Sequence, residues 1–288
     1  MSTELPPLSE QASNLAKLLT QKVQKNDISV PLLPEVANKV ITLTQDPESD
    51  STQLAKLIQS DPSLAAHVMK IANSAAYSPN ASMVSLQQAI TRLGMNLISD
   101  IAIAASISTK MFKAPGFETH ISFIWKHALM TALWSKEIAR ACRLNVEATF
   151  LCGLLHSIGR PVALQTALEL ADAKDTVLST EDLLAIEESV HTEVGACVLK
   201  KWDMPLIICE SLQYFYSYND APHAKEQTAI VNAAAKFATH TLKPEEFSRT
   251  QLTEAEVLGD LNLYQDEVMD LLDKRDNVVG SMEAMSNK

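Results

Sequence analysis

The stretch Leu154-Leu155-His156-Ser157-Ile158-Gly159-Arg160 marks the sharpest change of character in the sequence. It is entered through the apolar run Phe150-Leu-Cys-Gly, and it ends in an imidazole, a hydroxyl and a guanidinium. The apolar run indicates a buried helix, which we expect to end at His156. The polar side chains of His156, Ser157 and Arg160 are therefore the first candidates for a functional site.

Around this stretch the whole chain has the pattern of an all-α protein. Hydrophobic residues make up 47% of the 288 positions, which is enough for a sizeable core. Only 7 glycines are present, and apolar residues recur at three- and four-residue spacing, as in helices with one buried face. The length exceeds one simple domain, so we expect an N-terminal helical bundle packed on a C-terminal helical bundle.

The charge of the chain restricts its partners. The formal net charge is -11, with 24 Lys and Arg against 35 Asp and Glu. A negative field repels nucleic-acid phosphates and anionic lipid, so binding to nucleic acid or to a membrane is not expected. The sequence contains no run of about 18 apolar residues, and its polar start lacks the layout of a signal peptide. We therefore expect a cytoplasmic protein.

The cysteines do not indicate a redox or zinc site. None forms a close C-x-x-C pair, and each lies in an apolar helical context, so buried thiols are expected. The residues are Cys142, Cys152, Cys197 and Cys209.

Residues 1–29 are expected to form an N-terminal helical extension that docks or frays, and residues 30–114 a first helical unit. Helix-start signals recur in this unit, and Gly94 can end a helix in the left-handed conformation. A long apolar helix is expected from about Asn96 to Met111, before a break at 113–117. The start signals are Pro34, Asp50 or Ser51, Asp61 with Pro62, and Ser85.

Residues 115–243 are expected to form a second helical unit, and residues 244–288 a C-terminal helical extension. The apolar side of that extension predicts either a cover on the body or a homodimer contact, followed by a polar end. The helices expected in the second unit begin near Ile121, end at His156, begin at Ser179 or Thr180, run from about His191 to Trp202, start at Pro205, and cover about Lys225 to Thr241; those of the extension cover Thr253 to Leu261 and Gln265 to Leu272.

Eight short strings lie along the two units: Leu33-Pro-Glu-Val36, Ser60-Asp-Pro-Ser-Leu64, Ile71-Ala-Asn-Ser-Ala-Ala-Tyr77, Ala89-Ile-Thr-Arg-Leu-Gly94, Trp125-Lys-His127, Gly153 to Arg160, His191-Thr-Glu-Val-Gly195 and Trp202-Asp-Met-Pro205. The Asn73 to Tyr77 string has no nucleophile beside a base, so we expect it to cap or bridge helix ends. In this order and spacing the strings resemble the HDOD family, a non-enzymatic branch of the HD superfamily of metal-dependent phosphohydrolases. The resemblance covers about residues 30 to 240 and implies an HD-like fold for the second unit.

The resemblance implies a specific metal site that this chain has largely lost. Active HD hydrolases hold one or two divalent metals with several His and two Asp, and the metals generate the nucleophilic water. In this chain His127, His156 and His191 remain as remnant ligands. Non-ligating residues fall at the other positions: Ser157 for the bridging Asp, Phe215-Tyr216 for a His-His pair, and Ala235 for the distal Asp.

Alternatives for this pocket remain open. Three histidines can hold zinc with a water in the fourth position, and Glu187, Glu188 or Glu193 could supply a replacement carboxylate. The competing interpretation is that the histidines are hydrogen-bonded within the bundle. No cofactor is expected, with a divalent metal (Zn, Fe, Mn or Mg) at low occupancy as the alternative. His120, His223 and His240 lie near helix ends and are expected on the surface.

Three hypotheses for function follow. The leading one is a bacterial signal-transduction protein that acts by binding and relays a signal to other signalling proteins, as the resemblance implies for the family. The second is a metal-dependent phosphohydrolase that acts on a nucleotide or phosphoester with an atypical metal site. The third is a small-ligand sensor in which Arg160, Ser157 and Tyr216 contact the ligand, although Arg160 is also explained as a partly exposed cation at a helix end.

Overall fold

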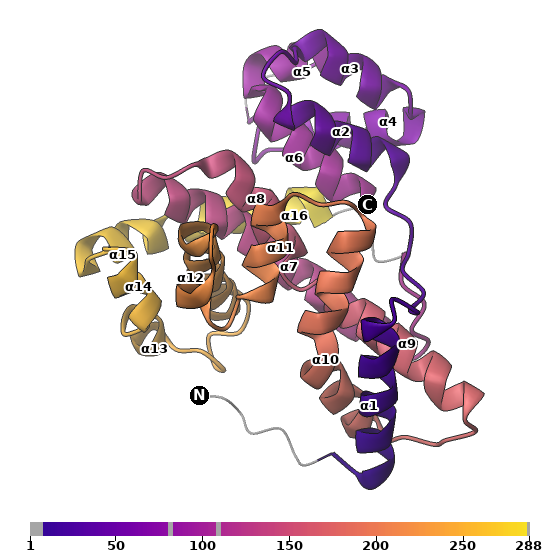
Figure 1. Ribbon diagram of the computed structural model, residues 1–288. Coiled ribbons are helices and arrows are strands. Elements are labelled where there is room, and N and C mark those ends of the chain that lie inside the picture. Colours follow the sequence, from indigo (N-terminus) through magenta and orange to yellow (C-terminus); the bar gives the residue numbers. More distant parts are fainter. Residues whose placement is uncertain (1–7, 80–82, 108–110, 287–288) are drawn as a thin grey trace.

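The computed structural model describes residues 8–79, 83–107 and 111–286, and helices provide all the regular structure in these ranges (Figure 1). The prediction of an all-α fold is confirmed. No helix among the described residues is both long enough and apolar enough to span a bilayer.

Five helices form the group at the top of Figure 1. In this group α2 (Glu35–Gln45) and α4 (Pro62–Ala72) pack on α6 (Met95–Ser106), and α3 (Ser51–Gln59) packs on α5 (Leu86–Leu93). The apolar faces of these helices close a common core, which explains their three- and four-residue periodicity.

Polar side chains begin several of these helices, as the sequence predicted. Asp50, Asp61 and Ser85 each accept hydrogen bonds from backbone N–H groups in the first turn of α3, α4 and α5. Gly94 separates α5 from α6 with a positive φ of 89°, but its ψ of 154° is extended rather than left-handed helical. In the Asn73 string, the Asn73 amide bonds both the N–H and the C=O of Met83, so that residue bridges a loop as expected.

The second group is built around one long central helix. That helix, α7 (Glu118–Ala141), packs on α8 (Val146–Leu155) and α12 (Lys225–Leu242), whereas α9 and α10 pack along each other. The other elements of the group are α9 (Gly159–Ala173), α10 (Thr180–Lys201), α11 (Leu206–Gln213) and the short 3₁₀ helix η2 (Tyr218–Asp220).

Two helix predictions in this group were wrong. No helix was predicted over α9, in which Pro161 lies in the first turn, where proline is tolerated. Two helices were predicted over α10, one starting at Ser179 or Thr180 and one at about His191. In the structure α10 is one continuous helix, and Glu187 and His191 are buried side chains within it.

The N-terminal helix α1 (Glu10–Gln24) packs on α10 and α9, far from the α2–α6 group (Figure 1). Its apolar residues Leu15 and Leu19 are buried, so the helix docks on the body. The chain after it is held in place by the indole N–H of Trp202, which donates to the carbonyl oxygen of Pro31 at 2.8 Å.

The C-terminal extension covers the body. Its last two helices, α15 and α16, pack on α7, and α16 also contacts α6. The expected polar end is instead α16, in which Val278, Met282 and Met285 are buried. The extension comprises α13 (Arg249–Thr253), α14 (Glu256–Asp260), α15 (Gln265–Asp273) and α16 (Arg275–Ser286).

Two glycines set the helix crossings on either side of His156. A Cβ on Gly153 would lie 2.7 Å from the Cα of Ala132, at the crossing of α8 over α7. A Cβ on Gly159 would lie 1.9 Å from the carbonyl oxygen of His191, at the crossing of α9 over α10. Both atoms belong to backbone, which cannot rotate away. Close helix contact at these two points requires glycine.

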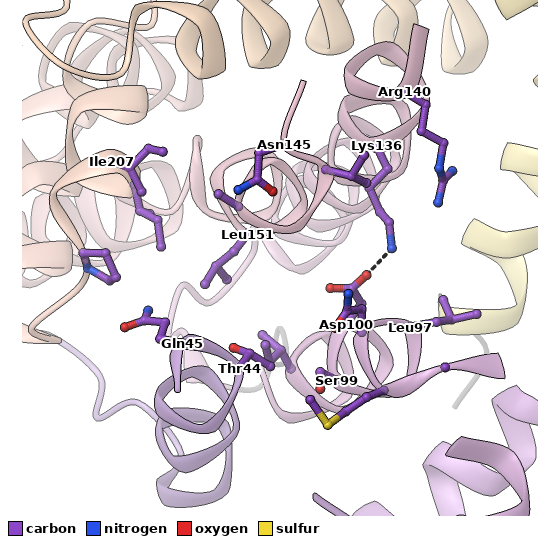
Figure 2. A pocket seen from close by; sticks show the side chains of 18 of the residues that line it. Thr44, Gln45, Leu97, Ser99, Asp100, Lys136, Arg140, Asn145, Leu151 and Ile207 are labelled. Atoms are coloured by element: carbon purple, nitrogen blue, oxygen red, sulfur yellow. Dashed lines mark hydrogen bonds and ion pairs between the residues drawn. The ribbon is translucent and has the colours of Figure 1, made fainter. Parts of the chain in front are cut away.

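A cleft of about 840 Å³ separates the two groups of helices (Figure 2). The α6 carboxylate of Asp100 and the α7 ammonium of Lys136 form an ion pair across it, and both side chains are largely buried. Ser99, beside Asp100 on α6, also lines the cleft, and its buried hydroxyl has no hydrogen-bond partner among the residues that the structure describes. The Asp100–Lys136 pair therefore connects α6 to the central helix of the second group.

We expect Gly159→Ala to lower the free energy of unfolding by about 3 kcal/mol or more, because the new methyl group would overlap the α10 backbone. Gly259→Ala in α14 is the matched control, since a Cβ there meets no atom within 4 Å. That change should alter stability by less than about 1 kcal/mol, in the stabilising direction. Guanidinium denaturation followed by circular dichroism measures both. Equal effects of the two substitutions would contradict the crossing argument.

For the pair between the groups, we expect Asp100→Asn to destabilise the protein by about 2 kcal/mol or more, because a largely buried ammonium loses its counter-ion. Replacing both residues, as Asp100→Asn with Lys136→Met, should cost less than the sum of the two single changes. Urea midpoints of the four proteins give the coupling energy. Additive effects would show that the two charges do not stabilise each other.

Candidate ligand-binding site

The structure brings the three predicted histidines to one cavity of about 650 Å³ in the second group of helices. His127 comes from α7, His156 follows the end of α8, and His191 comes from α10. The α12 helix forms the remaining wall, and the other predicted site residues, Ser157, Arg160 and Tyr216, line the same cavity.

Six aromatic and imidazole side chains that line the cavity form a continuous chain of rings. Each ring centroid lies between 5.0 and 6.3 Å from the next. Phe215 and Tyr216 meet edge to face, and so do Tyr216 and His191. This side of the cavity therefore presents aromatic surface as well as imidazole nitrogen atoms. The order of the chain is Phe123, His127, His156, Phe215, Tyr216 and His191.

Hydrogen bonds set the tautomers of two imidazoles. The Nδ1 atom of His156 lies 2.7 Å from the carbonyl oxygen of Gly153, and that of His191 lies 2.8 Å from the carbonyl oxygen of Glu188. A carbonyl oxygen only accepts, so each Nδ1 must carry the proton and each Nε2 a lone pair. The lone pair of His191 is engaged by the Tyr216 hydroxyl, 3.2 Å away.

The third imidazole has the opposite tautomer. The hydroxyl of Thr239 donates to the carbonyl oxygen of Ala235 at 2.9 Å, which leaves its oxygen to accept from Nε2 of His127 at 3.0 Å. The Nε2 atom of His127 therefore carries a proton, and this nitrogen cannot bind a metal ion without rearrangement.

Burial keeps these imidazoles neutral. It lowers the pKa of His127 to about 4 and that of His156 to about 3, and the positive charge of Arg160 adds to both effects. Burial followed by Arg160 also lowers the pKa of His191. All three rings are thus uncharged at neutral pH.

Arg160 is held in an ion-pair network on the α10 side of the cavity. Its guanidinium donates to Glu187 at 3.1 Å and to Glu188 at 2.5 Å, and lies 3.5 Å from the Tyr216 hydroxyl. Burial lowers the pKa of Arg160, but the two carboxylates outweigh burial and the net shift is upward. Arg160 therefore lies partly exposed in the first turn of α9, and its charge is paired within this network.

The carboxylates considered as replacement ligands are engaged elsewhere. Glu187 is only 1% exposed, and its second oxygen lies 2.7 Å from Nε2 of His120. Glu188 lies 2.5 Å from Arg160, whose positive charge overcomes burial and lowers the pKa of Glu188. Glu193 is on the exposed side of α10. The two cavity-side acids thus neutralise an arginine.

The residues present do not match a hydrolytic metal centre. Such a centre needs several lone pairs aimed at one point, with carboxylates to offset the metal charge. Of the three imidazoles here, His127 presents an N–H through Nε2 and His191 gives its lone pair to Tyr216. Within the described ranges, no three His, Cys, Asp or Glu side chains form a group suited to a metal ion.

Several residues of the cavity were not predicted. His120 was expected on the surface, but it lines the cavity and bonds Glu187. Its position seven residues before His127, two helical turns away on the same face, was a usable signal. On α12, Asn232, Lys236 and Thr239 lie on the cavity side at spacings of four and three residues.

Comparison with known proteins agrees with the fold. A model of the HDOD domain matches residues 30–218. An uncharacterized protein of Treponema pallidum (strain Nichols) is 18% identical over 244 residues, which cover 82% of this chain and 46% of that protein. The chain thus spans about half the length of this curated relative.

Solved structures share the architecture at low sequence identity. An HDOD domain protein of unknown function from Geobacter sulfurreducens has a TM-score of 0.72 and 22% identity, over 95% of this chain and 98% of that one. A Shewanella amazonensis SB2B protein, proposed by name to be a metal-dependent phosphohydrolase, has a TM-score of 0.69 and 20% identity, over 96% and 99%. A Marinobacter aquaeolei VT8 protein, proposed to act in signal transduction, has a TM-score of 0.67 and 21% identity, over 99% and 68%.

The lowered histidine pKa values predict acid sensitivity. Below about pH 6.5 these histidines are protonated in the unfolded chain but stay neutral in the folded protein. The folded state therefore keeps its full stability above that pH and loses stability as the pH falls towards 4. Each ring adds a slope of about 1.4 kcal/mol per pH unit in this window. His156→Gln should reduce the slope by about that amount, measured by urea denaturation in metal-free buffer between pH 4 and 7. An unchanged slope would mean that His156 is protonated in the folded protein.

Proposed function

The chain belongs to the HDOD family, whose model matches residues 30–218, and from this we propose that it acts in bacterial signalling by binding rather than by catalysis. A ligand or partner that engages the second group of helices would change the state presented to another signalling protein. The protein would serve as a relay with no reaction of its own.

The observation that carries this proposal is the donor chemistry around His156. Its neighbour is Ser157, a buried residue that offers a hydroxyl where a metal centre needs an anionic oxygen. The His156 ring is neutral, and the next ring along the wall, His127, turns an N–H towards Thr239. A metal ion here would lack the negative charge that balances it, and without the metal no hydroxide nucleophile forms at neutral pH.

A second support is the physical connection from the cavity to the rest of the molecule. The central helix α7 carries His127 on its cavity side and Lys136 further along, and Lys136 pairs with Asp100 of α6. One rigid helix therefore contacts both the cavity and the α2–α6 group. A binding event that favours one position of α7 would change the population of arrangements between the two groups.

The alternative is a metal-dependent phosphohydrolase with an atypical site. It requires the His127 ring to change tautomer and an acid to leave Arg160. Both changes are chemically accessible when a metal ion binds, so loading the protein with metal separates the two functions.

We expect protein purified and incubated with Zn²⁺, Fe²⁺, Mn²⁺ or Mg²⁺ to retain far less than one metal per chain, by elemental analysis. It should also release no phosphate from phosphomonoesters, and no alcohol from phosphodiesters, above background. His240→Ala is the matched control for His156→Ala, because His240 bonds Phe247 and does not line the cavity. Stoichiometric metal with turnover that survives His240→Ala and disappears in His156→Ala would establish the hydrolase instead.

A further inference from the structure

On α12, which forms one wall of the cavity, Lys236 lies next to Ala235, the position at which the family resemblance implies a distal Asp. Residues spaced by three, four and seven positions on this helix share one face, and Asn232, Ala235, Lys236, Thr239 and Lys243 all line the cavity. Lys236 directly follows Ala235. The same turn of helix thus supplies an ammonium group and no acid.

Each of the other lysine and arginine side chains lining the cavity is paired with a carboxylate. Arg160 bonds Glu187 and Glu188. Lys243 bonds Glu246 at 2.7 Å and lies over the Phe123 ring, 4.6 Å from its centroid. These groups have little positive charge left for a ligand.

Lys236 differs from them. Its ammonium donates to the amide oxygen of Asn232 at 2.6 Å, and no ion pair with an acid is found for it among the described residues. The side chain is partly buried, and burial lowers its pKa with no carboxylate opposing the shift. A neutral amide offsets only part of the cost of removing a charge from water.

We propose that Lys236 is the anchor of a site for a small aromatic anion, a flat ring that carries a carboxylate or phosphate group. The anionic group would lie against the ammonium, and the ring against the chain of aromatic side chains that includes His156 and Phe215. This inference rests on the proposed binding function and names the class of ligand.

The dimensions of the cavity agree with such a ligand. A volume of about 650 Å³ lies within the range of small-molecule pockets and leaves room for a ring beyond the anionic group. Ser157 and Thr192, which also line the cavity, offer hydroxyl donors that an anionic oxygen can accept from. The unprotonated Nε2 of His156 suits a protonated phosphate oxygen, which a carboxylate ion lacks, so the two groups can be distinguished by experiment.

The test uses four probes of graded chemistry, phenyl phosphate, benzoate, neutral benzamide and inorganic phosphate, in NMR titrations of the full chain. Phenyl phosphate or benzoate should bind one to one, with whichever binds tighter identifying the anionic group. Benzamide and inorganic phosphate should bind at least tenfold more weakly than the tighter anion. Benzamide binding as tightly as the anions would overturn the proposal, as would the absence of binding by both anions.

Substitutions of the cavity lysines test whether Lys236 supplies the positive charge that binds the anion. Lys236→Met should weaken binding of the tighter anion at least tenfold, whereas Lys243→Met, the matched loss of a paired cation from the same cavity, should weaken it less than threefold. Lys236→Arg should restore affinity to within threefold, which keeps the test informative where Lys236→Met fails to fold. Equal losses in the Lys236→Met and Lys243→Met proteins would refute an anchoring role.

Phenol release from phenyl phosphate, followed in the same samples, separates this inference from the proposed function. Binding without release supports both. Release in the presence of metal would contradict the non-catalytic function, while the Lys236→Met titration would still decide the anchor. Failure of both anions to bind, with no release, would remove the anion site and leave the relay function standing.

Discussion

The close crossings at Gly153 and Gly159 are the constraint on which the rest of the site depends. Each lies three residues from His156, and each lets one helix touch the backbone of another where any side chain would collide. The first crossing places α8 on the helix that carries His127, and the second places α9 on the helix that carries His191. The three imidazoles converge because these backbone contacts bring their helices together.

Burial of the three imidazoles between these helices determines the charge of the cavity. Rings removed from water stay neutral, and the buried carboxylate of Glu187 and the partly exposed one of Glu188 both bond Arg160. In a hydrolytic centre the positive charge would come from metal ions and the negative charge from ligating carboxylates. In this chain both signs come from side chains that neutralise each other, apart from Lys236 on α12.

The sequence predicted helix starts better than it predicted the cavity, for physical reasons. A cap such as Asp50 or Asp61 acts on backbone groups two or three residues away, so local sequence contains the whole interaction. The bond between His120 and Glu187 joins residues 67 positions apart, so the local sequence around either residue does not predict it. The same holds within α10, which was predicted as two helices: Glu187 is buried in it through its bond with His120, 67 positions away.

The same reasoning explains how the scaffold stays intact with Ser157 and Ala235 at positions where the family resemblance implies metal ligands. A fold whose helices were held together by bound metal would lose its packing when the carboxylates were replaced, because metal binding would then be folding energy. Here the crossings are made by glycine and by apolar side chains such as Leu155 and Val194, which are fully buried. The crossings therefore hold the helices in place, while the side chains that line the cavity determine its charge. Under the proposed function, the position of α7 between that cavity and the Asp100–Lys136 pair would connect a bound ligand to the other group of helices.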